Sequence, residues 1–281
     1  MKIIKSIRQM QSWAEQRRGR GKTIGFVPTM GALHEGHHSL MRAARRRCDA
    51  VVVSIFVNPA QFGPNEDYAR YPRDAKGDAA LCRLEKVDIL FMPTAEAIYP
   101  EGHQTTISVK PLGDGLEGAF RPNHFSGVAA VVAKLFQIVK PQMAFFGQKD
   151  YQQTVVIRRL VQDLHFPVKI IVCPTVREKD GLAMSSRNRY LSSEGRRAAR
   201  VLFKAMQLGR DQIREGKRNA AAVRNEMTRW IRQEPLAKID YVAITHPETL
   251  EEVLHIKGPV VLLLAVRIGK TRLIDNLLLK H

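Results

Sequence analysis

The feature that most constrains the fold of this chain is the regular alternation of apolar and amphipathic segments through its first two-thirds. The apolar segments are short and rich in β-branched residues, which is typical of buried strands, and the segments between them have helical spacing. We predict strands at residues 24–27, 51–57, 89–92, 144–146 and 169–173, and helices at 39–47, 74–86, 128–139 and 152–163. A looser segment at residues 105–109 is a further strand candidate. The alternation indicates an α/β fold with a mostly parallel sheet covered on both faces.

The pattern changes after about residue 176. One or two basic helices are predicted within residues 193–232, followed by strand-like runs at 239–245, 260–266 and 272–276. No helical segment separates the last two runs, which favours a small antiparallel sheet with helices. We therefore expect two domains, an α/β domain over residues 1–176 and a smaller α+β domain over residues 177–281.

Composition excludes several classes of protein. The longest apolar run, residues 259–266, is far shorter than the roughly 20 residues that a membrane-spanning helix needs. The N-terminus has no apolar signal region, and the three cysteines lack metal-ligand spacing. We expect a cytoplasmic protein with structural thiols and no membrane partner.

The net charge of +18 favours anionic partners such as nucleotides or nucleic acid, without deciding between them. Basic clusters such as residues 45–47 and 196–197 lie within helical patterns and lack interleaved aromatics. A solvated basic surface explains them, and we expect no specific nucleic-acid partner. A nucleic-acid-binding protein, whose affinity would fall steeply with salt, remains the alternative from a different class.

Two histidines mark the first candidate site. His34 and His37 lie three residues apart around Gly36, directly after the predicted strand at residues 24–27. A helix start has unpaired N–H groups and a partial positive charge, and Gly31 and Gly36 let the backbone approach an anion. Imidazoles there can stabilise charge that builds on a phosphoryl group, so this turn predicts a phosphate site. His38 is expected to point to another side of the helix.

The second candidate follows the predicted strand at residues 144–146. Lys149 offers a point charge for phosphate oxygens, and Asp150 can accept from ribose hydroxyls or orient the lysine. Gln152 and Gln153 suit a small polar substrate. An Asp150 helix cap with solvated neighbours is an equally good interpretation of this segment alone.

Two further segments carry polar side chains in loops. Ser185, Ser186 and Arg187 offer a flexible clamp for phosphates, in a loop of the kind that completes a site only when substrate is bound. A surface loop with a helix cap is the alternative interpretation of this segment alone. Asn58 and Gln61 follow the predicted strand at residues 51–57, where amides can hydrogen-bond a hydroxyl or a carboxylate. Arg121, farther along, either holds a carboxylate or belongs to a surface turn, and we leave it outside the candidate catalytic residues.

In combination, the segments VPTMGALHEGH, SIFVNPAQF, FFGQKDYQQ and KDGLAMSSRNRYL closely resemble the pantoate–β-alanine ligase family in order and spacing. The HxGH element by itself is shared with the wider nucleotidyltransferase and class I aminoacyl-tRNA synthetase group. The resemblance implies a Rossmann-like N-terminal domain that binds ATP and pantoate, a smaller C-terminal lid domain and a homodimer. It also implies a reaction in which pantoate attacks the α-phosphate of MgATP, and β-alanine then displaces AMP from pantoyl adenylate to give pantothenate.

The resemblance also implies roles for single residues. His37 would be the proton donor, with His34, Lys149 and Arg187 beside it at the phosphates, and Val176 would contact adenine through its backbone. Gln61 and Gln153, with Asn58 nearby, would grip pantoate, and Gln61 would also contact β-alanine. The ATP site would comprise Met30, Gly31, Ala32, Leu33, His34, Glu35, Gly36, His37, Gly147, Gln148, Lys149, Asp150, Val176, Met184, Ser185, Ser186 and Arg187.

Two points depart from a complete match. Asn123 and Ser126 stand where the family pattern often has glycine and arginine, which weakens any role for that turn. No carboxylate pair near His34 and His37 resembles a metal cage, so we expect Mg2+ to arrive with the phosphates and to keep several waters. A nucleotidyltransferase that joins ATP to a phosphorylated substrate is the second enzyme candidate, but the amide-rich segments argue against it because such a substrate would need more cations.

Overall fold

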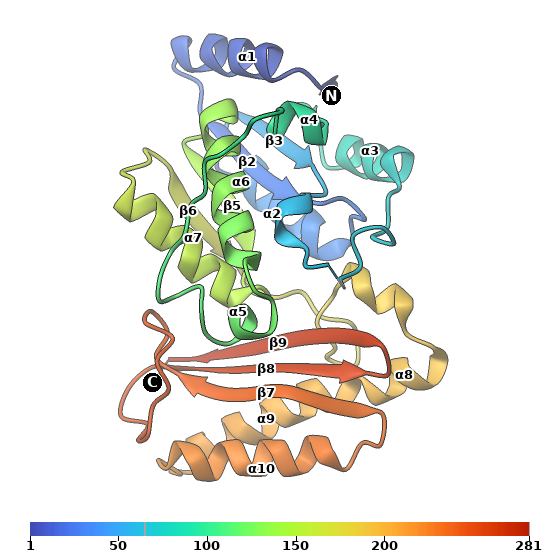
Figure 1. Ribbon diagram of the computed structural model, residues 1–281, viewed down its shortest axis with the longest axis vertical. Coiled ribbons are helices and arrows are strands. Elements are labelled where there is room, and N and C mark those ends of the chain that lie inside the picture. Colours follow the sequence, from blue (N-terminus) through green and yellow to red (C-terminus); the bar gives the residue numbers. More distant parts are fainter. Residues whose placement is uncertain (65, 281) are drawn as a thin grey trace. The chain divides into compact units, whose positions relative to one another are not determined.

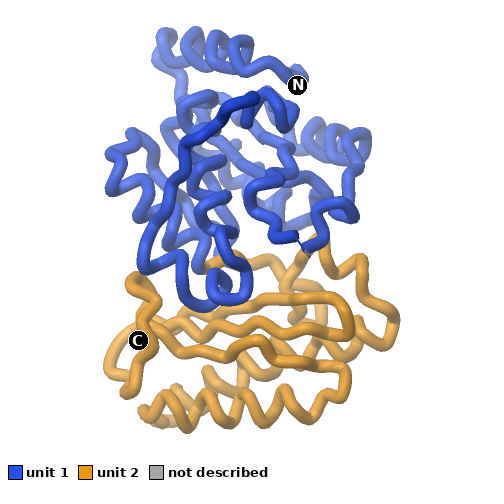
Figure 2. Tube along the Cα trace, viewed as in Figure 1, with its two compact units in different colours: residues 1–148, 152–174 blue, residues 149–151, 175–281 orange. Residues whose placement is uncertain are grey.

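A computed structural model describes residues 1–64 and 66–280 of the chain. It separates into two compact units (Figure 2). The first comprises Met1–Gln148 and Gln152–Pro174, and the second comprises Lys149–Tyr151 and Thr175–His281. Each unit has its own hydrophobic core, and no helix of the described residues is long and apolar enough to cross a bilayer.

The first unit contains a six-stranded parallel sheet in the order β1-β4-β3-β2-β5-β6. Its strands are β1 (Lys2–Ile4), β2 (Ile24–Thr29), β3 (Ala50–Ile55), β4 (Ile89–Phe91), β5 (Met143–Gly147) and β6 (Lys169–Cys173). The predicted parallel sheet is confirmed, and five of these strands match the five firm sequence predictions within a few residues. β1 was missed because three residues are too few to show a period.

The helices of the first unit cover both faces of this sheet (Figure 1). They are α1 (Ile7–Gly19), α2 (Glu35–Arg45), α3 (Ala75–Leu84), α4 (Ala95–Ile98), α5 (Glu117–Phe120), α6 (His124–Val139) and α7 (Tyr151–Asp163), with a 3-10 turn η1 (Pro59–Gln61). Residues of α1, α6 and α7 pack with Phe26 and Val52 in one core, and residues of α2 and α3 pack with Val27 and Val53 in another. Successive strand residues therefore face opposite layers, as a doubly covered sheet requires.

Two sequence predictions in this unit were wrong or incomplete. Residues 105–109 are not a strand. Their apolar spacing arises because Ile107 and Val109 pack against the core without pairing to a strand. Helix α1 was missed because its sequence is mostly polar, although Met10 and Ala14 are fully buried.

The second unit has an α+β fold, as predicted, in which helices pack on an antiparallel sheet. Its sheet has the order β7-β8-β9 and is antiparallel, with β7 (Ala237–Thr245), β8 (Val260–Ile268) and β9 (Thr271–Leu279). The predicted one or two helices are three, namely α8 (Ser193–Ala198), α9 (Arg200–Arg214) and α10 (Ala220–Arg232), and a 3-10 turn η2 spans Ser186–Tyr190. Alternate residues of β8, such as Leu262 and Leu264, share a core with Leu202 and Met227 of the helices.

The order of the parallel strands creates a switch point between β2 and β5. Strand β2 pairs with both β3 and β5, while the chain proceeds outward from β2 in one direction and from β5 in the other. Ligands of such sheets bind beyond the carboxyl ends of the strands at this point. Residues 30–37 follow β2, Asn58 and Gln61 follow β3, and Gly147 ends β5.

Candidate functional site

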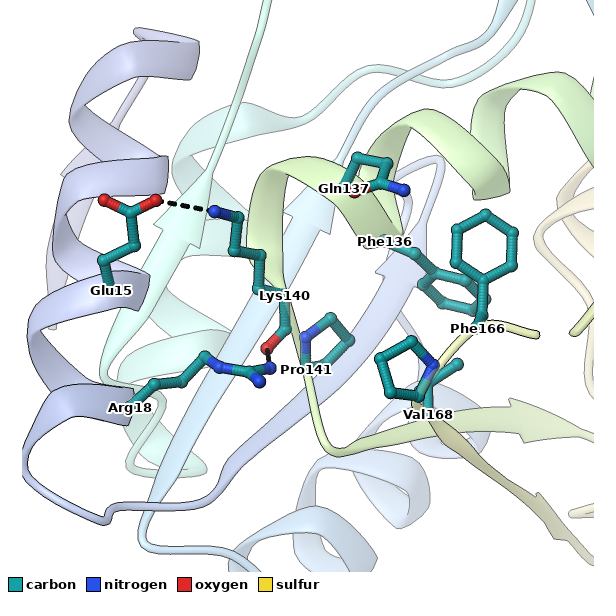
Figure 3. A pocket seen from close by; sticks show the side chains of 9 residues that line it. Glu15, Arg18, Phe136, Gln137, Lys140, Pro141, Phe166 and Val168 are labelled. Atoms are coloured by element: carbon teal, nitrogen blue, oxygen red, sulfur yellow. Dashed lines mark hydrogen bonds and ion pairs between the residues drawn. The ribbon is translucent and has the colours of Figure 1, made fainter. Parts of the chain in front are cut away.

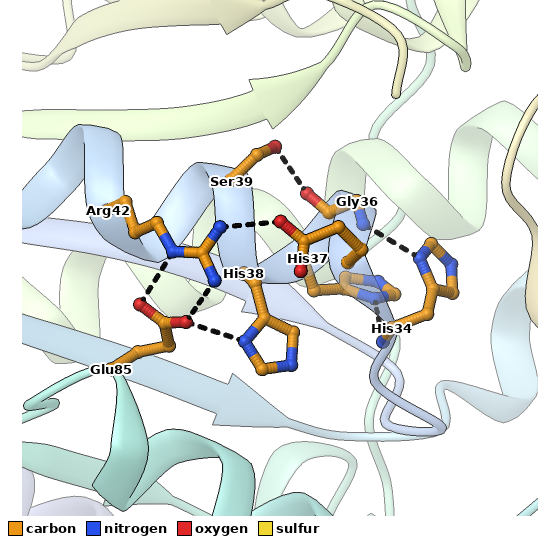
Figure 4. A network of polar contacts seen from close by, with 8 residues as sticks. His34, Gly36, His37, His38, Ser39, Arg42 and Glu85 are labelled. Atoms are coloured by element: carbon orange, nitrogen blue, oxygen red, sulfur yellow. Dashed lines mark hydrogen bonds and ion pairs between the residues drawn. The ribbon is translucent and has the colours of Figure 1, made fainter. Parts of the chain in front are cut away.

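The two histidines of the HEGH turn form the first turn of α2. This helix begins at Glu35, four residues earlier than predicted, with His34 as its N-cap. The Nδ1 atom of His34 accepts a hydrogen bond from the Gly36 N–H at 3.1 Å, and the Nδ1 atom of His37 accepts from the His34 N–H at 3.3 Å (Figure 4). The two ring centroids lie 4.2 Å apart.

These bonds assign the proton of each imidazole. A ring nitrogen that accepts a hydrogen bond carries no hydrogen, so the neutral rings of His34 and His37 hold their proton on Nε2. Each histidine is thus an Nε2–H donor at the carboxyl end of β2. Both histidines therefore have the tautomer that can donate to an anionic oxygen.

The helix start differs from the sequence prediction in one respect. Unpaired amides were expected there, but the Gly36 N–H binds the His34 ring, and the His37 N–H donates to the His34 carbonyl at 2.7 Å. A capping box, which is formed here by two imidazoles, satisfies these donors within the protein. The backbone amides of Gly36 and His37 are thus paired within the protein.

His38, the next residue, contacts a different group. Its Nδ1 atom lies 2.7 Å from a carboxylate oxygen of Glu85, which also accepts from Arg42 (Figure 4). Arg42 in turn donates to Glu35. This network ties the solvent side of α2 to the end of α3 and lies apart from the rings of His34 and His37.

Asp78 of α3 anchors the loop before the histidines, and sequence reasoning missed it. Its carboxylate accepts from the Ala32 N–H at 2.9 Å and from the Leu33 N–H at 2.8 Å, and the residue is 3% exposed. Ala32 has a φ of +50°, and a Cβ on Gly31 would lie 2.9 Å from Asp78 Oδ2. The carboxylate therefore holds an unusual backbone conformation in place. The available signal was its spacing: Asp78 lies four residues before Cys82, so a helix over residues 74–86 places the carboxylate on the same face as the buried thiol.

The amides of Asn58 and Gln61 lie together after β3. Asn58 Nδ2 donates to Gln61 Oε1 at 3.2 Å and to the Gly127 carbonyl at 3.1 Å. Gln61 Nε2 lies 2.9 Å from the sulfur of Met30, so the segment after β3 meets the loop after β2. Both amide residues are buried, which fixes their orientation within the first unit.

The two glutamines at the start of α7 have different environments. The Gln152 side chain donates to the carbonyls of Leu112 and Gly115, both at 2.8 Å, and accepts from the Glu117 N–H at 3.0 Å. These hydrogen bonds hold a loop of the first unit. Gln153 is half-buried, and its contact with a substrate stays a prediction. Gln148, one turn earlier, donates its N–H to the Cys173 carbonyl at 2.8 Å.

In the second unit, Lys149 and Asp150 are neighbours in space as well as in sequence. The Lys149 ammonium lies 3.7 Å from Asp150 Oδ1. The Lys149 carbonyl accepts from Asn276 Nδ2 at 2.8 Å, which attaches this short segment to β9. The position of the lysine main chain is thus set by the sheet of the second unit.

The loop that contains the predicted phosphate clamp is a short hairpin held by a buried ion pair. The Met184 N–H donates to the Val176 carbonyl at 3.0 Å across this hairpin. Arg177 donates to both carboxylate oxygens of Asp275 at 2.7 and 2.9 Å, and its guanidinium lies 4.6 Å from the centre of the Phe203 ring. Asp275 is 2% exposed and was not predicted as part of the site.

The clamp residues continue from this hairpin. Ser185 caps the 3-10 turn η2 by accepting from the Arg187 N–H at 3.2 Å, and Ser186 is buried. The structure thus brings Ser185, Ser186 and Arg187 together in one turn of the second unit.

A cavity of about 330 Å³ in the first unit contains none of the predicted site residues (Figure 3). It opens where the chain enters β5 and β6, at the amino ends of the strands. Its walls are formed by Glu15, Arg18, Phe136, Gln137, Lys140, Pro141, Phe166, Pro167 and Val168. It therefore lies at the amino ends of the strands, whereas the candidate site lies at their carboxyl ends. It plays no part in the chemistry considered below.

The described residues offer neither a cluster of metal ligands nor a reactive thiol. Within residues 1–64 and 66–280, no group of three or more histidine, cysteine or acidic side chains could hold a metal ion. Cys48, Cys82 and Cys173 are free and buried, and burial raises the pKa of the Cys82 thiol to about 12. A thiol with such a pKa is a poor nucleophile at neutral pH.

The chain is similar over its full length to known proteins of one family. Residues 2–278 match the model of the pantoate-beta-alanine ligase family. The pantothenate synthetase of Heliobacterium modesticaldum is 53% identical over all of both chains, and that of Moorella thermoacetica is 54% identical over 100% of this chain and 99% of that protein.

Solved structures agree with this similarity. The pantothenate synthetase of Thermus thermophilus has a TM-score of 0.93 at 47% identity and covers 99% of both chains. A pantoate-beta-alanine ligase from Francisella tularensis, solved in complex with beta-gamma ATP and beta-alanine, has a TM-score of 0.79 at 39% identity, covering 99% of this chain and 97% of that one.

Proposed function

The chain belongs to the pantoate-beta-alanine ligase family, and we propose that it condenses (R)-pantoate with β-alanine at the expense of ATP. The products are pantothenate, AMP and pyrophosphate, and pantoyl adenylate is the intermediate. The observation that carries this proposal is the pair of Nε2–H donors on His34 and His37 at the switch point of the parallel sheet. The Francisella tularensis relative, solved with an ATP compound and β-alanine, supports the two substrates.

The first step activates the carboxylate. A carboxylate and an amine do not condense at neutral pH because the leaving group would be oxide or hydroxide. A pantoate oxygen attacks the α-phosphorus of ATP, the bond to the bridging oxygen breaks, and pyrophosphate leaves with the electron pair. His34 and His37 donate through Nε2–H to the phosphate oxygens, and His37 is the proton donor.

The second step forms the amide. The amine of β-alanine attacks the acyl carbon of pantoyl adenylate, the bond to the AMP oxygen breaks, and the amine loses a proton. Gln61, Gln153 and Asn58 position the substrates, so this step depends mainly on proximity and orientation. Their neutral amides can hydrogen-bond the hydroxyls and carboxylates of the substrates. They do not compete for the phosphates with the cationic side chains.

The second unit supplies the remaining contacts in this proposal. Lys149 and Arg187 bind phosphate oxygens, Ser185 and Ser186 complete the clamp, and Val176 contacts adenine. The remaining members of the ATP site are those given by the family resemblance, from Met30 to His37 and from Gly147 to Asp150. In this proposal residues 1–176 are the ATP- and pantoate-binding domain and residues 177–281 are the lid, although Lys149–Tyr151 and residues 175–176 belong to the second compact unit.

Three further properties belong to the same proposal. Mg2+ enters as part of the MgATP substrate, and the phosphates with their waters hold it, which suits a site whose donors are histidines and amides. The protein is a homodimer, which light scattering behind a sizing column would test. It acts in the cytoplasm, where ATP is available.

The experiment that tests this function measures pyrophosphate release from MgATP with D-pantoate, followed by AMP release when β-alanine is added. We expect pyrophosphate only with pantoate, and AMP with pantothenate only when both substrates are present. Pyrophosphate without pantoate, or a stable adenylylated product that β-alanine does not discharge, would contradict the proposal.

A further inference from the structure

The turn that begins at Arg121 had no assigned role, yet its side chains contact the main chain of Gln61, one of the proposed substrate amides. Arg121 binds both carboxylate oxygens of Glu66, with Nε at 2.9 Å and Nη2 at 2.5 Å. The arginine is 14% exposed and the glutamate 23% exposed, so this pair is largely shielded from water. Arg121 does hold a carboxylate, but the carboxylate belongs to the protein.

Arg121 and His124 converge on one carbonyl oxygen. Arg121 Nη2 lies 3.3 Å from the carbonyl oxygen of Gln61, and His124 Nδ1 lies 2.8 Å from the same atom. The remaining ring nitrogen, Nε2, lies 3.1 Å from Arg121 Nη1. A segment some sixty residues away in sequence therefore fixes the main chain at Gln61.

The hydrogen bonds at His124 require one protonation state. A carbonyl only accepts and a guanidinium only donates, so Nδ1 carries the proton and Nε2 has the lone pair. The neutral ring is 8% exposed, and burial lowers the pKa of His124 to about 4. At neutral pH the imidazole therefore stays a fixed, uncharged link between Arg121 and Gln61.

Close contact between α6 and the η1 turn completes the arrangement. A Cβ on Gly127 would lie 2.2 Å from the Ala60 carbonyl oxygen, so a side chain at this position would push the turn away. The Gly127 carbonyl accepts from Asn58 Nδ2, and Asn58 donates to the Gln61 side chain. Both the main chain and the side chain of Gln61 are thus held by the same short stretch of α6 and the turn before it.

We propose that Arg121 and His124 are positioning residues for Gln61, which set the direction of its amide toward pantoate and β-alanine. The inference rests on the proposed function, because it assumes that Gln61 grips both substrates. Neither side chain needs to touch a substrate in this scheme. Loss of either bond would let the η1 turn shift, and even a small misplacement of a substrate contact weakens binding strongly.

The test compares Michaelis constants in the full-length protein. We expect Arg121→Ala and His124→Ala to raise KM for pantoate and β-alanine about tenfold, and to change KM for ATP less than about twofold. His124→Asn keeps an N–H donor near the position of Nδ1, so we expect KM within about threefold of the wild type. Rescue by asparagine separates a positioning bond from simple filling of space.

Arg45→Ala is the matched control. It breaks the ion pair of Arg45 with Asp88, 2.7 Å long and in the same unit, at the amino end of β4. We expect unchanged constants for all three substrates. Unfolding curves accompany every variant, and His124→Ala, with His124→Asn as its rescue, is the second arm if Arg121→Ala does not fold.

Three outcomes overturn the inference. The first is a folded Arg121→Ala or His124→Ala protein with wild-type KM for pantoate, and the second is an equal rise of KM for pantoate and ATP. The third is a His124→Asn protein as defective as His124→Ala. A wild-type protein without pantoate-dependent pyrophosphate release would instead contradict the proposed function, so the two failures are distinguishable.

Discussion

Two loops with proposed nucleotide contacts are each anchored by a buried carboxylate, but in different ways. In the first unit, Asp78 accepts from two backbone amides of residues 30–37. In the second unit, Asp275 accepts from the side chain of Arg177, at the base of the hairpin over residues 176–184. One carboxylate shapes a main chain directly, whereas the other secures a hairpin whose backbone is already paired with itself.

This difference assigns different tasks to the two anchors. The loop before the histidines has positive φ at Gly31 and Ala32, and its own backbone pairing does not impose that shape. Asp78 therefore defines its conformation. The hairpin needs no such help, so Asp275 determines mainly where Arg177 is held. We expect changes at Asp78 to affect the nucleotide constants, and changes at Asp275 to affect stability first.

The largest expected effect is on stability at Asp275. Asp275→Ala removes the carboxylate partner of the Arg177 guanidinium, and breaking a buried pair costs about 3 kcal/mol. The double variant Arg177→Met with Asp275→Leu removes both charges and should recover most of this loss. Urea unfolding followed by circular dichroism measures both. Equal losses in the single and double variants would show that packing, not the charge pair, anchors the hairpin.

A paired substitution at His37 sharpens the comparison within the first loop. Asparagine retains an acceptor near the position of Nδ1, which caps His34, and lacks the Nε2–H donor. We expect His37→Asn to lower the rate of pyrophosphate formation about 100-fold with little change in stability. His37→Gln, which restores a donor near Nε2, should retain more activity. A greater loss with glutamine than with asparagine would mean that the cap matters more than the donor.

Stability should also depend on pH through His124. Its ordinary pKa of 6.5 falls to about 4 in the folded protein, because burial and the nearby Arg121 disfavour the charged ring. The unfolded chain binds a proton first as the pH drops, so the contribution of neutral His124 is full above pH 6.5 and is lost toward pH 4. Between pH 7 and pH 5 this group should account for about 2 kcal/mol of lost unfolding free energy.

The measurement is urea unfolding of wild type and His124→Asn at both pH values. The variant lacks this titration, so its stability should fall less over the same interval. Parallel losses in the two proteins would show that His124 titrates normally and is not held neutral.

The smallest expected effect tests the role given to Asp78. Asparagine offers only one acceptor for two amides, and its own NH2 group faces the second. We expect Asp78→Asn to raise KM for ATP about tenfold, with pantoate KM nearly unchanged. Initial rates at varied MgATP measure this. A rise of KM for pantoate alone would show that Asp78 acts on the pantoate contacts and not on the nucleotide loop.

Much of the architecture was predictable because it depends on local pattern. The five strands from residue 24 to residue 173 and the antiparallel sheet after residue 237 follow from apolar periodicity and from the segments between them. The failures have physical reasons. The apolar spacing at residues 105–109 reflects packing of Ile107 and Val109, and a mostly polar α1 is stabilised by burial of Met10 and Ala14.

The candidate site was predictable in part for the same reason. His34, His37, Asn58, Gln61, Lys149 and Arg187 lie in contiguous motifs that pair a polar group with a strand end, so each motif is visible in a short stretch of sequence. The residues that position them come from elsewhere along the chain. Asp78 lies more than forty residues from the amides it holds, Asp275 lies ninety-eight residues from Arg177, and His124 lies sixty-three residues from Gln61.

The sequence by itself determined the fold class and the family, and it supplied the candidate side chains for the chemistry, because these depend on periodicity and on motifs within one segment. The tertiary structure alone decided the tautomers of the histidines, the paired state of the amides at the start of α2 and the three distant anchors. A hydrogen bond is set by the approach of two atoms and by burial from water, and neither is encoded in the spacing of residues along one chain.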